Sequence, residues 1–255
     1  MSSTDPARPE SDRPTNVRWL IFALACGTSW FLYLHRYTWN FVAPKLKQEY
    51  GWSDTEAQAV YSFFNVSYGL GQIPSGILCD YFGPHIFLMS IIAMWSVALP
   101  LHALAATQSA LILVRLIFGA AQAGTFPILA KVSRNWFPLS YRTSVQAGIA
   151  TFSGRSGGAM ASIIMATLLI GTFQLTWQQS LWVMGGAGIL FALLFGILFR
   201  SRPNIDRRVN SAELRHINMG DAVMPATSER QFLSWSRALT SLSLWFLLLQ
   251  QLIVA

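Results

Sequence analysis

Six long apolar stretches, separated by short polar segments, constrain this sequence more than any other feature. Each has roughly 20 residues or more, the length that an α-helix needs to cross the hydrocarbon core of a bilayer. A helix satisfies its own backbone hydrogen bonds inside lipid, and the alternating pattern of barrel strands is absent. The sequence therefore predicts an all-α membrane protein with transmembrane helices at residues 19–43, 57–78, 86–106, 110–130, 143–170 and 180–199.

A seventh apolar run ends at Ala255, before a membrane span would be complete. We expect residues 237–255 to be the start of a truncated seventh helix, and the chain to be a fragment of a longer protein. The proline-containing residues 1–17 predict a disordered tail, followed by the six-helix unit at residues 18–200. The polar residues 201–236 predict a cytoplasmic linker, with a short amphipathic helix near residues 212–219.

The basic residues lie mainly on one side of the expected membrane. With the N-terminus in the cytoplasm, thirteen of the 18 Lys and Arg residues fall in cytoplasmic segments, and only Lys45 and Lys47 fall in outer loops. Cytoplasmic segments of membrane proteins carry such an excess. We therefore expect a multi-pass plasma-membrane protein (in the inner membrane, for a bacterial source) with a cytoplasmic N-terminus. The same bias accounts for the net charge of +7 without a nucleic-acid partner.

Three arginines, Arg36, Arg115 and Arg155, lie inside the expected spans, where a charge is costly unless it has a partner or a function. All 11 acidic residues lie in tails, in loops or at the end of a span. An anionic ligand is a natural counter-ion, because a guanidinium forms paired hydrogen bonds with a carboxylate or phosphate. Three alternatives stay open: Arg115 reaches the outer surface, Arg155 hydrogen-bonds helix-end carbonyls, or a second half supplies acids.

Polar side chains share helix faces with these arginines, at the spacing of three or four residues that brings side chains together. They predict a wet cavity in which hydroxyl and amide groups bind the oxygens of a sugar or a carboxylate. The alternative is hydrogen bonding between helices. The candidate substrate-binding residues are Tyr33, Arg36, Tyr37, Asn40, Asn65, Tyr68, Gln72, Arg115, Gln122 and Arg155; Tyr61 and Gly119 lie on the same faces.

Gly154 and Gly158 have the small-xxx-small spacing of a surface where two helices cross. His35 and His102 are candidate proton carriers because a histidine titrates near neutral pH, and a simple interfacial role is the alternative. Two cysteines cannot form a disulfide framework and are interpreted as buried thiols. The sequence indicates neither a metal nor a cofactor.

Residues 76–83 resemble the loop signature of the major facilitator superfamily, Gly-x-x-x-Asp-Arg-x-Gly-Arg-Arg. Gly76, Asp80 and Gly83 match it, whereas other residues occupy its basic positions. Gln122 stands where a Glu is usual in the anion:cation symporter family of that superfamily. The segments that resemble this family contain Arg36 and residues 68–76, 115–127, 136–142, 153–158, 202–203 and 212–217.

This resemblance implies the N-terminal half of a twelve-helix fold, in which two six-helix halves rock around a central site. It implies symport of small organic anions, including sugar acids, with a proton or sodium ion, and it implies that Arg36 and Arg115 contact the anion. The expected partners are this anion, the co-transported ion, the lipid bilayer, and the missing C-terminal half or a second copy of the chain. The residues expected to act in conformational change are Gly76, Asp80, Gly83 and Arg142.

Two other functions compete with transport. Residues 154–157 fit the Gly-x-Ser-Gly of an intramembrane serine protease, which needs a His base on a later helix beside the serine. The only later histidine is His216, in the expected linker, so we do not expect an enzyme. The other alternative is a non-transporting remnant or a sensor built on the transporter fold.

Overall fold

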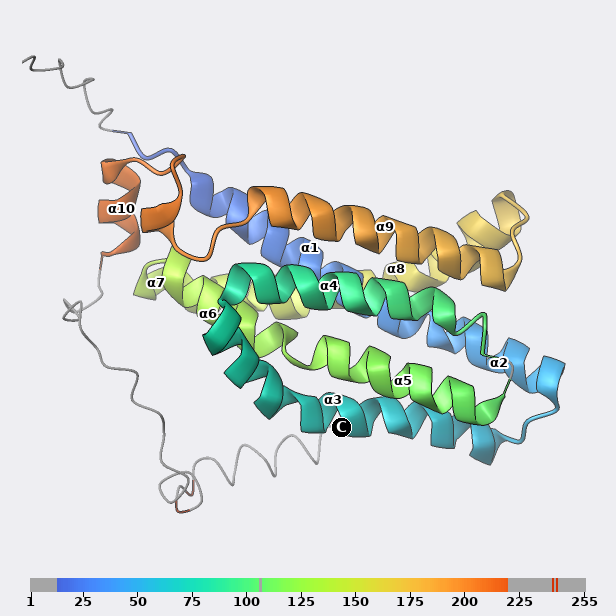
Figure 1. Cartoon of the computed structure of the whole chain (residues 1–255). Coiled ribbons are helices and arrows are strands. Elements are labelled where there is room, and N and C mark those ends of the chain that lie inside the picture. Colours follow the sequence, from blue (N-terminus) through green and yellow to red (C-terminus); the bar gives the residue numbers. More distant parts are fainter. Residues whose placement is uncertain (1–12, 106, 220–239, 241, 243–255) are drawn as a thin grey trace, which may run out of the picture. The chain divides into compact units, whose positions relative to one another are not determined.

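The structure is a computed structural model that describes residues 13–105, 107–219, 240 and 242 (Figure 1). The chain divides into two units, Met1–Gly220 and Asp221–Ala255, and the elements below belong to the first. Every regular element in residues 13–105 and 107–219 is a helix, which confirms the all-α prediction. The predicted start of a seventh helix lies almost entirely outside the described residues.

Helical segments cover all six of the predicted spans. Three of the predicted spans consist of more than one element, as described below, and short helices continue the chain after the sixth. The elements are α1 (Val17–Tyr37), α2 (Trp39–Tyr50), α3 (Asp54–Phe82), α4 (Pro84–Leu101), α5 (Gln108–Ala123), α6 (Thr125–Trp136), α7 (Leu139–Gln146), the π-helix η1 (Ala147–Ser153), α8 (Gly154–Ser162), the π-helix η2 (Ile163–Thr172), α9 (Trp177–Leu198), the 3₁₀-helix η3 (Pro203–Ile205) and α10 (Ser211–Ile217).

The first predicted span is interrupted at Thr38, between α1 and α2. The Thr38 hydroxyl donates a hydrogen bond of 2.6 Å to the carbonyl oxygen of His35, one turn earlier. The fourth span is interrupted at Gly124, between α5 and α6, and the fifth changes from α- to π-helix on both sides of α8. Such interruptions often mark functional positions in helices. The predicted amphipathic helix near residues 212–219 is confirmed as α10.

Within the part of the chain that the structure describes, five helical segments are long and apolar enough to cross a membrane: Val17–Tyr50, Pro84–Leu101, Gln108–Trp136, Leu139–Thr172 and Trp177–Leu198. The second predicted span corresponds to α3, which has 29 residues but is not among these five. Its Ser, Asn, Gln and Tyr side chains lower its mean hydropathy. In a helix that lines a polar site, such residues are expected on the face turned away from lipid.

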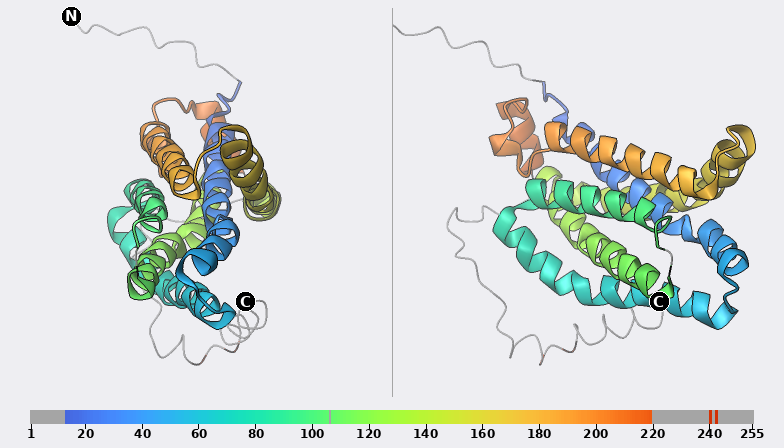
Figure 2. Two further views of the ribbon diagram at one scale, coloured as in Figure 1. Left: turned by 90° about the vertical axis from the view of Figure 1, so that its right-hand side faces the viewer. Right: turned by 45° about the vertical axis from the view of Figure 1, so that its right-hand side comes forward.

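Glycines bring the helices of the bundle into close contact. A Cβ atom at Gly119 of α5 would lie 2.5 Å from the carbonyl oxygen of Phe64 on α3, and one at Gly157 of α8 would lie 2.3 Å from that of Trp30 on α1. The small-xxx-small prediction for residues 154–158 is thus confirmed, since α8 crosses α1 at this stretch. Figure 2 shows the same bundle along its length and nearly end-on.

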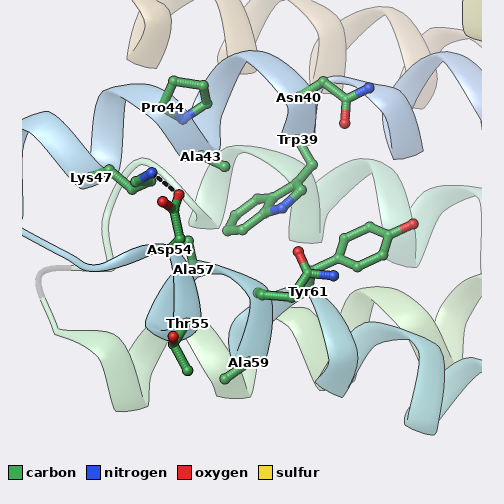
Figure 3. Close-up of a pocket in the computed structure, with 11 residues that line it drawn as sticks. Trp39, Asn40, Ala43, Pro44, Lys47, Asp54, Thr55, Ala57, Ala59 and Tyr61 are labelled. Carbon is green, nitrogen blue, oxygen red and sulfur yellow. Dashed lines mark hydrogen bonds and ion pairs between the residues drawn. The ribbon is translucent and has the colours of Figure 1, made fainter.

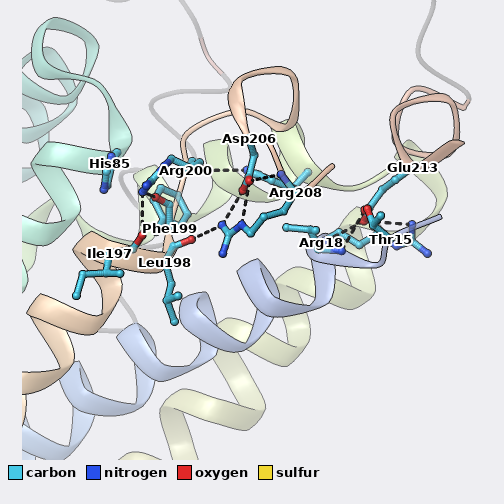
Figure 4. Close-up of polar contacts among 12 residues, drawn as sticks. Thr15, Arg18, His85, Ile197, Leu198, Phe199, Arg200, Asp206, Arg208 and Glu213 are labelled. Carbon is cyan, nitrogen blue, oxygen red and sulfur yellow. Dashed lines mark hydrogen bonds and ion pairs between the residues drawn. The ribbon is translucent and has the colours of Figure 1, made fainter. Parts of the chain in front are cut away.

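At one end of the bundle, α10 lies against the start of α1 (Figure 4). The carboxylate of Glu213 is fully buried and accepts hydrogen bonds from the backbone N–H groups of Val17 (3.1 Å) and Arg18 (3.0 Å). A helix leaves its first N–H groups without partners, so Glu213 satisfies the N-terminus of α1 from almost 200 residues away. At the opposite end of the bundle, α2 meets the start of α3 (Figure 1).

Candidate anion-binding site

Arg36, on the last turn of α1, is half-buried among aromatic rings and an amide. Its Nε atom donates a hydrogen bond of 3.1 Å to Oε1 of Gln122. Its guanidinium carbon lies 4.6 Å from the ring centre of Tyr68 and 5.0 Å from that of Phe64. The Nη2 atom is buried and has no hydrogen-bond partner. The Arg36 guanidinium therefore lies inside the bundle with one hydrogen-bond donor, Nη2, available to a ligand.

Gln122, on α5, is fully buried and links α1 to α5. Besides accepting from Arg36, it donates a hydrogen bond of 3.3 Å from Nε2 to the carbonyl oxygen of Leu32. An amide orients Arg36 without neutralising it, whereas a Glu at this position would bring a negative charge to the guanidinium. The Gln therefore preserves the positive charge of the site.

Arg115 lies one turn before Gly119 on α5, in the interior of the bundle. Only 2% of its surface is exposed, and its guanidinium carbon lies 3.6 Å from the ring centre of Trp39. Its Nε atom is buried without a hydrogen-bond partner. The alternative that Arg115 reaches the outer surface with its head group is therefore wrong, because aromatic rings of the bundle cover the guanidinium.

Arg155, on α8, is exposed and lines a groove of about 640 Å³ together with Tyr33 and Tyr37 of α1. The rings of the two tyrosines stack at a centroid distance of 6.0 Å. A Cβ atom at Gly154 would lie 2.8 Å from the Tyr33 ring, so glycine is what allows α8 to come this close to α1. The glycine-rich stretch thereby places Arg155 beside the face of α1 that carries Arg36.

The predicted polar residues of α3 divide into two groups. Tyr68 contacts Arg36, whereas Asn65 and Gln72 are exposed and contact neither Arg36 nor Arg115 through a described hydrogen bond. Asn40 and Tyr61 line a pocket of about 930 Å³ between α2 and α3 (Figure 3). The structure thus brings Tyr33, Arg36, Tyr68 and Gln122 together.

Two aromatic residues of this region were missed by the sequence analysis. Phe64 lies between the arginines, with its ring centre 5.0 Å from the Arg36 carbon and 5.8 Å from the Arg115 carbon. Trp39 covers Arg115 and also lines the pocket in Figure 3. Phe64 is spaced at helical intervals between Tyr61 and Tyr68, a signal that could have revealed it. No pattern in the sequence indicates that Trp39 covers an arginine on another helix.

Three of the predicted conformational residues, Gly76, Asp80 and Gly83, lie at the other end of α3, and Arg142 lies on α7. Asp80 forms an ion pair of 2.6 Å with Lys131 of α6, so a basic residue on another helix pairs with it. Gly83 ends α3 with a φ of 80°, a backbone conformation that favours glycine. At Gly76 a Cβ atom would meet open space. The Nε atom of Arg142 donates a hydrogen bond of 2.9 Å to the carbonyl oxygen of Phe137.

The two histidines flagged as proton carriers are buried rather than interfacial. Nδ1 of His102 lies 2.9 Å from the carbonyl oxygen of Leu99, and the His102 ring packs edge-on against Phe118. His35 and His102 line a small cavity together with Arg115. Within residues 13–105 and 107–219, no group of three or more His, Cys, Asp or Glu side chains could hold a metal ion.

The apolar bundle and its cationic, aromatic face define a multi-pass α-helical membrane protein with a polar site between its helices. The family model described as the Major Facilitator Superfamily matches residues 21–255. The chain belongs to this superfamily, which confirms the family predicted from the motifs. Its fold is the N-terminal half of the superfamily fold, with five segments that qualify as membrane spans by length and hydropathy.

Several curated proteins with similar sequences are transporters of organic anions. A protein of Cupriavidus necator, named a probable sulfoacetate transporter, is 27% identical over 79% of this chain and 46% of its own length. A probable galactarate/D-glucarate transporter of Escherichia coli is 29% identical over 88% of this chain and 50% of its own length. The chain thus spans about half the length of the curated relatives it matches.

Among solved structures, the chain resembles a bacterial homologue of the human lysosomal transporter Spinster, crystallised in an inward-facing and unoccupied conformation. The TM-score is 0.64 with 20% sequence identity, and the match covers 74% of this chain and 44% of the solved one. This likeness supports the fold. The relatives are named as transporters rather than enzymes. They therefore favour transport over the intramembrane protease that was weighed from the sequence.

Proposed function

We propose that this chain is the N-terminal half of a secondary active transporter that carries small organic anions, such as sugar acids, together with a cation. The observation that supports the proposal most is the charge imbalance at the site. Arg36 and Arg115 contact aromatic rings and an amide, and no ion pair among the described residues involves either of them. An anion would provide the missing negative charge.

The residues of the site would have different tasks in binding. Arg36, held at Nε by Gln122, would offer its free Nη2 to a carboxylate, since a planar guanidinium suits bidentate recognition. Arg155 would attract a second negative group in the groove with Tyr33 and Tyr37. Exposed Asn40, Asn65 and Gln72 and the tyrosine hydroxyls would bind the hydroxyl groups of a sugar acid.

The proposed topology places the N-terminus in the cytoplasm, following the excess of basic residues on that side. In this orientation α10 and the start of α1 would lie at the cytoplasmic end, and the pocket between α2 and α3 would lie toward the outer end. Residues 201–236 would form the central loop between two halves, and residues 237–255 the start of the seventh helix. Gly76, Asp80, Gly83 and Arg142 would act when the halves rock against each other.

Uptake measurements test this proposal. Radiolabelled galactarate and sulfoacetate would be offered to proteoliposomes that hold the complete transporter with this chain as its N-terminal half. We expect Arg36→Ala to lower anion affinity about a hundredfold, equivalent to about 2.8 kcal/mol. Arg215→Ala, on an exposed face of α10, is the matched control and should leave uptake unchanged. Undiminished uptake by Arg36→Ala would remove Arg36 from the site.

The coupled cation requires a separate experiment. Uptake would be driven in turn by an inward proton gradient and by an inward sodium gradient, with the other ion held equal across the membrane. Stimulation by one gradient identifies the ion, and equal uptake without either gradient contradicts symport. A thermal-shift screen of the purified chain against galactarate, sulfoacetate and the neutral sugar alcohol galactitol would show whether this half binds anions by itself.

A further inference from the structure

We propose that Trp39 is a gate between the pocket in Figure 3 and a buried anion subsite at the guanidinium of Arg115. When the indole moves aside, the subsite binds a carboxylate or sulfonate group of the transported anion. This inference deepens the proposed function and rests on it. It assigns the order in which residues of the chain contact the anion. Its test measures the chemical accessibility of Arg115 and does not depend on transport.

Trp39 borders two spaces of very different size. On one side lies the pocket of about 930 Å³ between α2 and α3, which is also lined by Asn40 and Tyr61. On the other side lies a cavity of about 10 Å³, lined by Arg115, His35 and His102 among others. A cavity of this size holds about one water molecule. No organic anion fits beside Arg115 until Trp39 moves.

Arg115 lacks the partners that a buried cation needs. Its guanidinium carbon lies 3.6 Å from the Trp39 ring centre, 5.8 Å from that of Phe64 and 6.0 Å from that of Phe118. A cation–π contact recovers less free energy than the burial of an unpaired ion costs. The unpartnered Nε atom adds a further desolvation cost. The rings therefore cover the charge without replacing a counter-ion.

The position of Trp39 in the chain suits a moving side chain. It is the first residue of α2, directly after Thr38, where the first span divides into α1 and α2. Figure 3 shows the indole extending from α2 toward α3, among the residues that line the pocket. The pocket offers far more volume than an indole needs, so a rotation at the α1–α2 junction can move the ring out of contact with Arg115.

The test is labelling of arginines with phenylglyoxal, a dicarbonyl reagent that modifies exposed guanidinium groups, followed by mass spectrometry of the full chain in lipid nanodiscs. In the unmodified chain Arg115 should react slowly because Trp39 covers it. If the open state holds roughly 10% of the population or less, Trp39→Ala should raise the labelling rate of Arg115 about tenfold or more. Trp182→Ala, which removes an exposed indole from α9, is the matched control.

Ligand protection tests the subsite itself. In Trp39→Ala, sulfoacetate or galactarate should slow labelling of Arg115, while the neutral galactitol should not. Trp39→Phe keeps an aromatic cover, so its labelling rate should lie between the two; it also serves if Trp39→Ala does not fold, which a uniform rise at all arginines would reveal. Equal labelling of Arg115 in the unmodified chain and both variants, or no protection by either anion, overturns the proposal. The labelling rate of Arg115 and its protection by an anion are both measured without transport. Failure of this proposal can therefore be distinguished from failure of the proposed function, which the uptake by Arg36→Ala tests.

Discussion

Buried cations have different neighbours in two regions of this bundle, the end where α10 meets α1 and the region around Arg36 and Arg115. At the end where α10 meets α1, cations lie beside acids: Arg18 is 3.7 Å from the Glu213 carboxylate, and the Arg208 guanidinium donates hydrogen bonds of 2.9 and 2.7 Å to that of Asp206 (Figure 4). Around Arg36 and Arg115, the neighbours are aromatic rings and the amide of Gln122. In the first arrangement each cation has an acid beside it, whereas the second lacks a negative charge.

This difference separates structure from function within one chain. A buried charge with a fixed partner holds parts of the fold together, as Glu213 joins α10 to the start of α1. A buried charge with only rings and an amide around it is costly to the fold. Such a cost is expected where a site must accept a charged ligand and release it again. The predictions below change the charge balance of each end in turn.

The largest expected effect is at the α10 end. Replacing Glu213 by Ala removes the acceptor of two backbone N–H groups and the partner of Arg18, so the free energy of unfolding should fall by about 3–5 kcal/mol. Unfolding of the full chain in detergent, followed by circular dichroism, measures this. Glu213→Gln should lose less because it keeps an acceptor, and Arg215→Ala should lose almost nothing. A change within 0.5 kcal/mol, roughly the scatter of surface substitutions, would contradict the capping role.

The next substitution gives the region around Arg36 an acid beside its cation, as at the α10 end. Gln122→Glu places a carboxylate beside Nε of Arg36, in the position where Oε1 now accepts a hydrogen bond. The new charge competes with the ligand for the guanidinium, so affinity for galactarate or sulfoacetate should fall about tenfold, or about 1.4 kcal/mol. Binding titrations at neutral pH measure this. Gln48→Glu, an equal change of charge on an exposed turn of α2, should leave affinity as it is; an equal loss in both variants would point to a general charge effect.

Much of the fold could be predicted from the sequence because apolar length and charge placement act locally. The six spans, the amphipathic α10 and the crossing of α8 over α1 all follow from residues close to each other in the chain. The interruption at Thr38 was not predicted. Residues on both sides of it are apolar enough to continue a helix, so no local pattern in the sequence marks the break.

The candidate site was predictable only in part, for a related reason. Helical spacing places Tyr33, Arg36 and Tyr37 on one face of α1, and hydropathy marks Arg115 as unusual. Which ring covers which guanidinium depends on how α1, α3 and α5 cross, and no local pattern encodes that crossing. The pairing of Arg18 with Glu213 joins residues almost 200 positions apart, and the sequence analysis placed both in polar ends without a partner.

A smaller effect concerns pH at the α10 end. The hydrogen bonds from the Arg208 side chain hold the pKa of Asp206 below its ordinary value, against the opposing effect of burial. A carboxyl whose pKa is lower in the folded chain stabilises the fold above its unfolded pKa, about 3.9. This stabilisation is about 1 kcal/mol, the net contribution of a typical hydrogen bond, because the Arg208 side chain is partly exposed to solvent. It is lost as pH falls through the folded pKa.

The stability difference between the unmodified chain and Asp206→Asn should therefore be constant from pH 5 to 7 and shrink below about pH 4. Unfolding midpoints measured across this range check it. A difference that instead grows as pH falls would mean that burial, and not Arg208, determines the protonation of Asp206.

The smallest effect should come from the ion pair at the end of α3. The side chains of Asp80 and Lys131 are 59% and 42% exposed, and exposed ion pairs contribute about 0.2–1 kcal/mol. A double-mutant cycle of Asp80→Ala and Lys131→Ala should therefore give a coupling free energy below about 1 kcal/mol. A weak pair that breaks and forms easily suits a segment that must change its contacts as two halves move. A coupling above about 2 kcal/mol would instead place Asp80 with Glu213 among the fixed charges of the fold, and the motif would then serve stability rather than movement.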